Sequence, residues 1–167
     1  MIRRPDKAKR PLYDADQRAR RDASRWTLVQ GVLAPLQFLV FAVSLGLVLR
    51  TLATGEGADA ANVSVVLKTL VLYAIMVTGS IWEKAVFGRY LFAPAFYWED
   101  MVSMLVLALH TAYLVALATG ALDTAGLMVL ALAAYASYAV NAAQFVLKLR
   151  AARLQPISSG LVAEGAR

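Results

Sequence analysis

The chain has 167 residues, of which 60% are apolar, and it carries a formal net charge of +6. This apolar share exceeds that of ordinary soluble domains and predicts a single membrane-embedded domain. The absence of cysteine excludes disulfides, thiolate metal sites and cysteine nucleophiles. The cations gather in the N-terminal tail and near segment ends instead of along one recognition helix, so anionic lipid is the expected partner and nucleic acid is not.

The first segment, residues 1–25, is polar and basic and lacks the apolar periodicity of a core. Its many charges, followed by a long apolar run, do not fit a cleaved signal peptide, so we interpret it as a retained cytoplasmic tail. Asp14 followed by Gln17 matches a helix capping box. The pattern predicts a short basic helix over Ala15 to Ser24 that lies on the membrane surface.

Four segments are long and apolar enough to cross a hydrocarbon core of roughly 30 Å at about 1.5 Å per residue. They cover about 26–49, 63–82, 101–122 and 127–147. Short connections between them predict an all-α polytopic protein, an antiparallel four-helix transmembrane bundle over 26–149, with a C-terminal tail over 150–167. The distribution of cations places both termini and the connection after the second span on the cytoplasmic side of the membrane.

Each span contains polar residues that lipid disfavours. In the first span, Pro35 predicts a kink and Gln37 is expected to face other helices. In the second span, Lys68 lies near the outer end, and we expect its side chain to reach the interface by snorkelling. Both expectations follow from the cost of placing a polar group against lipid.

His110 is expected ~15 Å inside the third span from its cytoplasmic end. The chain has no second histidine, which excludes a bis-histidine haem, and no intrinsic metal site or cofactor is expected. Three roles remain open for this side chain. It could be an axial ligand to a metallated macrocycle, a proton carrier, or a packed histidine bonded to Tyr113 or to a backbone carbonyl.

The hinge between the second and third spans, Ile81 to Asp100, is unusually dense in charged and aromatic residues. Its acids are Glu83, Glu99 and Asp100, and its cations are Lys84 and Arg89. A belt at the lipid interface explains most of the aromatic residues individually. Five within nine positions nevertheless exceed what a belt needs and suit a flat apolar ligand: Tyr90, Phe92, Phe96, Tyr97 and Trp98.

Polar groups of the other spans are expected to meet the hinge at the cytoplasmic end. Asn141 and Gln144 belong to one polar stripe on the last span and point to this region. Carboxyl groups at a membrane boundary can hold a proton near neutral pH through desolvation, as general acid catalysis requires. In a purely structural alternative, the two acids that begin the third span cap it, and Glu83 pairs with a neighbouring hinge cation.

Three long runs of the chain resemble the vinyl bacteriochlorophyllide hydratase family: RRDASRWTLVQGVLAPLQFLVF, KTLVLYAIMVTGSIWEKAVFGRYLFAPAFYWEDMVSMLVLALHTAYL and YAVNAAQFVLKLRAARLQ. The resemblance covers about Leu12 to Gln155. It implies a hydro-lyase of bacteriochlorophyll biosynthesis that adds water across the ring-A vinyl group (C3, older C2) of chlorophyllide a or vinyl bacteriochlorophyllide. The product would be the 1-hydroxyethyl derivative. Such a substrate is a flat magnesium macrocycle with an ionised propionate, and other pigment-biosynthesis enzymes become candidate partners.

The resemblance assigns no catalytic residue, so roles are inferred from the reaction. Hydration needs a general acid for the terminal CH2 group, then a positioned water and a base. We expect Glu83 or Glu99 to be the acid, and Asp100 to be the base that also stabilises the cation. The expected substrate-binding residues are Arg89 or Lys84 for the propionate, Tyr90, Phe96 and Trp98 for stacking, Asn141 and Gln144 at the pocket, and His110 as a ligand to the substrate's magnesium.

Two further functional classes use the same residues without this reaction. A pigment-binding or photosynthetic-complex assembly protein would use the aromatic pocket without chemistry. A small proton-coupled carrier could use Glu83, Glu99 and His110 as a relay, although the chain lacks the inverted repeats of many transporters. An assay that detects hydration of a vinyl pigment distinguishes the enzyme from both alternatives.

Overall fold

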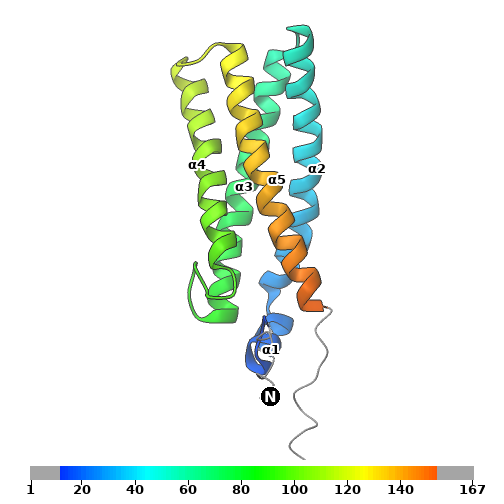
Figure 1. The fold of residues 1–167 in the computed structure, drawn as a ribbon, viewed down its shortest axis with the longest axis vertical. Helices are drawn as coiled ribbons and strands as arrows, with labels where there is room; N and C mark the ends of the chain where they lie inside the picture. The colour runs from blue at the N-terminus through cyan, green and yellow to red at the C-terminus, as the bar shows by residue number, and fades with distance from the viewer. Residues whose placement is uncertain (1–11, 154–167) are drawn as a thin grey trace, which may run out of the picture.

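The computed structural model describes residues 12–153, and every regular element in that range is a helix (Figure 1). The helices are α1 (Ala15–Ala23), α2 (Arg25–Thr54), α3 (Ala58–Phe87), α4 (Tyr97–Thr119) and α5 (Thr124–Arg153). The four long helices, α2 to α5, are each long and apolar enough to cross a membrane. The structure therefore confirms the predicted all-α, multi-pass membrane class.

Consecutive long helices run in opposite directions. Between α2 and α3, the Oγ atoms of Ser44 and Ser64 lie 2.6 Å apart, whereas Trp82 Nε1 donates to Thr27 Oγ1 at 3.0 Å nearer the other end. Residue numbers thus rise along one helix as they fall along its neighbour. As Figure 1 shows, α1, the connection after α3 and the final turns of α5 lie together at what we call the hinge end, and two short turns lie at the opposite end.

The helices extend beyond the predicted apolar spans because polar residues continue them at both ends. The clearest case is α3, which was expected over 63–82 and runs over Ala58–Phe87. It begins after Gly57 and ends before Gly88, both of which have left-handed backbone conformations with φ of 81° and 83°. Glycine adopts this conformation without the steric cost that a side chain brings, so it ends a helix sharply.

The interior of the bundle changes character along its length. The half away from the hinge packs small and aliphatic residues around two buried tyrosines, Tyr113 and Tyr135. The hinge end packs aromatic rings instead, with Tyr13, Val86 and Phe96 buried and other aromatic residues around them. Many large apolar side chains remain exposed on the outer faces of the four helices. Such a surface suits contact with lipid.

The predicted basic helix is present as α1, and its capping box is confirmed. The Gln17 backbone N–H donates to Asp14 Oδ1 at 2.7 Å, and the Asp14 N–H donates to Gln17 Oε1 at 3.1 Å. The helix docks on the hinge end of the bundle, where Arg20 Nε donates to the Val86 backbone oxygen at 3.0 Å. Tyr13, just before α1, is buried there. The location of α1 on a membrane surface remains a prediction.

Gln37 faces the bundle interior as expected, but the snorkelling expected of Lys68 is wrong. The Lys68 side chain is fully buried, and its Nζ atom lies 2.7 Å from His110 Nε2. The same atom lies 4.0 Å from the centroid of the Tyr138 ring. An imidazole acceptor on α4 and an aromatic face on α5 provide the partners that snorkelling would otherwise have found in water. The flexible lysine stem therefore turns inward.

Candidate functional site

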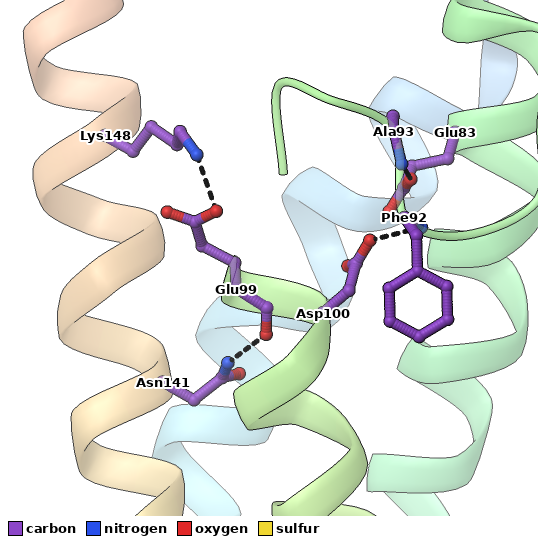
Figure 2. Close-up of polar contacts among 7 residues, drawn as sticks. All are labelled: Glu83, Phe92, Ala93, Glu99, Asp100, Asn141 and Lys148. Carbon is purple, nitrogen blue, oxygen red and sulfur yellow. Dashed lines mark hydrogen bonds and ion pairs between the residues drawn. The ribbon is translucent and has the colours of Figure 1, made fainter. Parts of the chain in front are cut away.

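The three hinge acids lie buried where α3, the connecting segment and the start of α4 meet (Figure 2). Glu83 lies one turn before the end of α3, and Glu99 and Asp100 lie in the first turn of α4. Their exposed fractions are 5%, 8% and 3%, respectively. Buried carboxyl groups need hydrogen-bond or charge partners, so the identity of each partner indicates what each acid can do.

Glu83 and Asp100 form one unit, which we call the acid pair. The Ala93 N–H donates to Glu83 Oε2 at 3.2 Å, and the Phe92 N–H donates to Asp100 Oδ2 at 2.7 Å. The electrostatics of the site also couple the two carboxyl groups, so that a proton on one can form a hydrogen bond to the other. A hydrogen bond between two carboxyl groups requires a proton on one of them. The acid pair therefore contains a potential proton donor and a potential proton acceptor in contact.

The backbone that donates to the acid pair is held in a disfavoured conformation. Phe92 has a φ of 58°, in the left-handed region that residues other than glycine rarely adopt. Such a conformation costs on the order of 1–3 kcal/mol and persists where the surroundings impose it. The hydrogen bond from the Phe92 N–H to Asp100 is one such constraint. Sequence patterns contained no signal for this contact, because it depends on a backbone angle.

Glu99 has a different environment, although it is the neighbour of Asp100. Its carboxylate accepts a hydrogen bond from Lys148 Nζ of α5 at 2.5 Å, which is also an ion pair. Asn141 Nδ2 donates to the Glu99 backbone oxygen at 2.8 Å, and Figure 2 shows this contact together with that of Lys148. Ser103 Oγ donates to Asn141 Oδ1 at 3.2 Å. The sequence pattern gave Lys148 no role at the site, so its contact with Glu99 was missed.

The structural alternatives account for only part of these contacts: Glu99 and Asp100 lie in the first turn of α4, where negative charge is favoured. The N-cap residue of α4 is Phe96, and no side chain caps that helix. Glu83 makes no ion pair with Lys84 or Arg89 among the described residues, where the ion pairs are Arg21–Asp22 and Glu99–Lys148. Glu83 and Asp100 are instead buried next to each other, and neither pairs with a cation at the surface.

The two predicted propionate-binding cations lie exposed on the hinge surface. Lys84 Nζ donates to the Gly88 backbone oxygen at 2.9 Å and lies 5.4 Å from the centroid of the Tyr90 ring. Arg89 makes no hydrogen bond or ion pair with residues 12–153. Its guanidinium is thus open to a ligand at the water boundary.

The predicted stacking residues separate into two groups. Tyr90 and Trp98 are exposed over 59% and 71% of their surface. Phe96 is 1% exposed and packs against the rings of Trp82, at a centroid distance of 5.7 Å, and Phe145, at the same distance. Two of the three rings are therefore available at the surface of the hinge, whereas the third is part of the protein's own aromatic packing.

The remaining predicted residues differ in their distance from the acids. Asn141 belongs to the Glu99 contacts, and Gln144 has a buried Oε1 atom without a hydrogen-bond partner. His110 lies about 15 Å along α4 from Asp100. Its Nδ1 atom contacts the Val106 backbone oxygen at 2.8 Å, and its Nε2 atom contacts Lys68. With both ring nitrogens engaged, this arrangement leaves no lone pair free for the substrate's magnesium.

The hinge end brings together the acid pair, the unpaired guanidinium of Arg89 and exposed aromatic rings beside an apolar bundle. Acid–base catalysis on an amphiphilic molecule is the chemistry that this combination suits. A carboxyl pair that donates one proton and accepts another would serve an addition or elimination of water.

Comparisons with known proteins give a consistent result. The family described as 2-vinyl bacteriochlorophyllide hydratase matches residues 13–151. The chain is 69% identical to a 2-vinyl bacteriochlorophyllide hydratase of Cereibacter sphaeroides over 87% of this chain and 90% of that protein. It is 64% identical to a protein of the same name from Rhodobacter capsulatus, over 90% of this chain and 88% of that protein.

The search of solved structures finds no match. The family match extends over nearly all of the described bundle, including the hinge and its three acids. On this evidence the chain belongs to the 2-vinyl bacteriochlorophyllide hydratase family.

Proposed function

We propose that this protein is a membrane-embedded hydro-lyase that adds water across the ring-A vinyl group of vinyl bacteriochlorophyllide or chlorophyllide a. The product is the 1-hydroxyethyl derivative, an intermediate of bacteriochlorophyll biosynthesis. The names of the two relatives support the reaction. The structural observation that carries the proposal is the buried contact between Glu83 and Asp100, because the reaction needs one proton donor and one proton acceptor.

The first step is protonation of the vinyl group. The carboxylic acid of Glu83 donates its proton to the terminal CH2 carbon, and the π electrons of the vinyl group form the new C–H bond. The adjacent carbon is left with a positive charge that the macrocycle delocalises. Asp100, ionised at this stage, stabilises that cation electrostatically in a site shielded from bulk water.

The second step adds water to the cation. The water oxygen bonds to the cationic carbon while the Asp100 carboxylate accepts one of the water protons. Glu83 is then ionised and Asp100 is protonated. Because a proton on one group can form a hydrogen bond to the other, the proton returns from Asp100 to Glu83 and restores the starting state. One water is consumed, and the protein gains and loses no proton overall.

The contacts of Glu99 favour Glu83 as the acid. The Glu99 carboxylate is occupied by the Lys148 ammonium on the α5 side of the site. Glu83 has no cationic partner among the described residues and contacts the proposed base directly. We therefore assign Glu99 a positioning role, in which it ties α4 to α5 beside the acid pair.

Substrate binding follows from the amphiphilic shape of the pigment. The ionised propionate stays at the water boundary and pairs with Arg89, with Lys84 as the second cation of the same surface. Tyr90 and Trp98 present exposed rings for stacking on the macrocycle. Gln144 supplies a buried amide oxygen near the Glu99 contacts.

The hinge end is assigned to the cytoplasmic side of the bacterial inner membrane. Cations gather at this end, on α1, in the hinge and on the final turns of α5, whereas Arg50 is the cation near the opposite turns. This asymmetry follows the positive-inside rule. A soluble substrate precursor and water would then reach the site from the cytoplasm, and a following pigment-biosynthesis enzyme could contact the same face.

A conversion assay tests the proposed function. Membranes that contain this protein as the sole added pigment enzyme are incubated with 3-vinyl chlorophyllide, and the products are analysed by mass spectrometry. The expected result is a pigment heavier by one water, which is absent from membranes without the protein. Pigment binding without this product would instead indicate a binding or assembly protein.

A further inference from the structure

A layer of polar side chains lies inside the bundle, about one helical turn further from the hinge surface than the acid pair. Ser103 of α4 follows Asp100 by three residues, so it lies about 4–5 Å further along the same face of that helix. Ser103 is 3% exposed, and its Oγ donates to Asn141 Oδ1 of α5 at 3.2 Å. This layer therefore borders the acid pair from the interior of the bundle.

Gln37 of α2 reaches the same depth from the other side of the bundle. Phe41 lies one turn after Gln37 on the same face of α2, and its ring lies 4.9 Å from the ring of Tyr138 on α5. Gln37 lies about 6 Å nearer the hinge end than Phe41, because α2 runs away from that end. Asn141 lies about 4–5 Å nearer the hinge end than Tyr138, because α5 runs toward it. Gln37 and Asn141 are thus at nearly equal depth.

The amide group of Gln37 has no partner in the protein. The side chain is 2% exposed, and neither its nitrogen nor its oxygen makes a hydrogen bond within residues 12–153. The packing around Phe41 at this depth is otherwise apolar, with Leu72 and Val106 buried beside Tyr138. An amide without partners is costly in the interior of a membrane protein. Gln37 is therefore suited to a ligand that both donates and accepts hydrogen bonds.

Gln30 shows that this feature is specific to the depth of Gln37. It lies two turns before Gln37 on the same face of α2. Its Nε2 atom donates to Thr78 Oγ1 at 2.7 Å and to the Ile75 backbone oxygen at 3.4 Å. The same residue type thus finds protein partners on α3 near the hinge end, whereas Gln37 finds none among the described residues.

Water is the ligand whose chemistry matches this layer. Gln37 offers one acceptor oxygen and two N–H donors, and Ser103 Oγ can still accept a hydrogen bond while it donates to Asn141. A buried water typically makes about three hydrogen bonds to polar groups that are otherwise unsatisfied. Water is also the second substrate of the hydration, and it is needed beside the acid pair.

We propose that Gln37 and Ser103 bind the water that adds to the pigment cation. This inference rests on the proposed function. From this layer the water oxygen bonds to the cationic carbon, one water O–H bond breaks, and its proton passes to the Asp100 carboxylate one turn away. The pigment reaches the acid pair from the hinge surface, whereas the water waits on the interior side. A bound pigment therefore covers the water without displacing it.

The first test detects the water without using the reaction. Full-length protein in nanodiscs, free of pigment, is irradiated with X-rays in ¹⁸O-labelled water, and methionine oxidation is measured by mass spectrometry. A bound water yields hydroxyl radicals in place, which oxidise the side chains beside it. Met76 packs at the depth of this layer, and Met128 is buried in the apolar half of the bundle. Met76 should be oxidised faster than Met128, and Gln37→Leu should lose this excess.

The second test measures conversion of the 3-vinyl pigment by the same variants. In Gln37→Leu, kcat should fall about tenfold, the effect of one hydrogen bond to the reacting water, with KM for the pigment unchanged. Gln37→Asn keeps a shorter amide and should recover part of both the rate and the Met76 oxidation. Gln30→Leu is the matched control: it loses an amide with protein partners, so thermal stability should fall while kcat and Met76 oxidation stay at wild-type values.

The results that overturn the proposal are distinct from those that overturn the hydratase assignment. Met76 oxidation that does not depend on Gln37, beside normal conversion, refutes the water site alone. Oxidation lost in Gln37→Leu at full kcat shows a bound water that is not the reacting one, which also refutes the proposal. An equal loss of kcat in Gln30→Leu assigns the effect to the scaffold and refutes it as well. Oxidation that depends on Gln37, without conversion by the wild type, supports the water site and refutes the hydratase.

Discussion

Replacing Glu83 with glutamine should abolish most of the hydratase activity while preserving the fold. The glutamine oxygen can still accept from the Ala93 N–H, and its amide nitrogen can donate to Asp100, so the contacts that hold the hinge are retained. The proton that the vinyl group needs is lost. General acid catalysis contributes about 10²- to 10⁴-fold, so kcat should fall by that factor, equivalent to about 3–5 kcal/mol on the barrier.

Glu99→Gln is the matched comparison. It removes the charge that pairs with Lys148, but the amide oxygen can still accept a hydrogen bond from the Lys148 ammonium, and the acid pair stays intact. The expected loss is therefore less than about fivefold in kcat. Both variants are assayed at saturating 3-vinyl pigment by mass spectrometry, with insertion checked by their retention in the membrane fraction. A Glu83→Gln variant near wild-type rate, beside a Glu99→Gln variant slowed 100-fold, would move the acid role to Glu99.

Three further predictions concern the scaffold. Phe92→Val should lower stability by about 1 kcal/mol or more relative to Phe92→Leu, measured by thermal unfolding in detergent, because a branched side chain is least tolerant of a φ of 58°. Burial raises the pKa of Tyr13 above its usual 10.0, with Arg21 opposing the shift, so the neutral form stabilises α1 docking. That stabilisation is present below pH ~10 and is lost as pH rises through the folded pKa. Limited proteolysis of the segment that follows α1 should therefore become faster as the pH rises above ~10. In the Tyr13→Phe variant, the rate of proteolysis should no longer depend on pH in this range. Ser44→Ala breaks contacts to Ser64 and Tyr135 and should cost about 0.6 kcal/mol in stability without slowing hydration.

Each scaffold prediction has a result that contradicts its reasoning. Equal melting of the two Phe92 variants would mean that the hinge relaxes out of the left-handed conformation at no cost. Persistent pH dependence in Tyr13→Phe would assign the titration to another group. Hydratase activity lost in Ser44→Ala would place catalytic function at the turn end of the bundle, far from the acid pair.

Local sequence patterns accounted for the helices. Apolar runs of membrane-crossing length predicted α2 to α5, and the capping box of Asp14 and Gln17 predicted α1, because both signals act within one segment of chain. The density of acids in the hinge also identified the end of the bundle where chemistry is proposed. The family resemblance, carried by long runs of sequence, was confirmed by the comparisons.

The division of roles among the acids required the tertiary structure. Glu99 and Asp100 are adjacent in sequence, but successive residues point about 100° apart around a helix. Glu99 consequently meets Lys148 of α5, whereas Asp100 meets Glu83 of α3. No pattern within the hinge distinguishes the two acids, because their partners belong to different helices.

The amino-acid sequence by itself determined a four-span helical membrane protein with a hinge dense in acids and aromatic residues, because span length, capping and composition are local properties. Only the tertiary structure decided which side chains turn into the interior and which stay at the surface. Lys68 could have reached the interface, and Phe96 could have faced a ligand, but His110 and the aromatic rings around Phe96 bring both into the interior. Those partners lie on other helices, and the free energy of a polar or aromatic contact depends on which groups packing brings within reach.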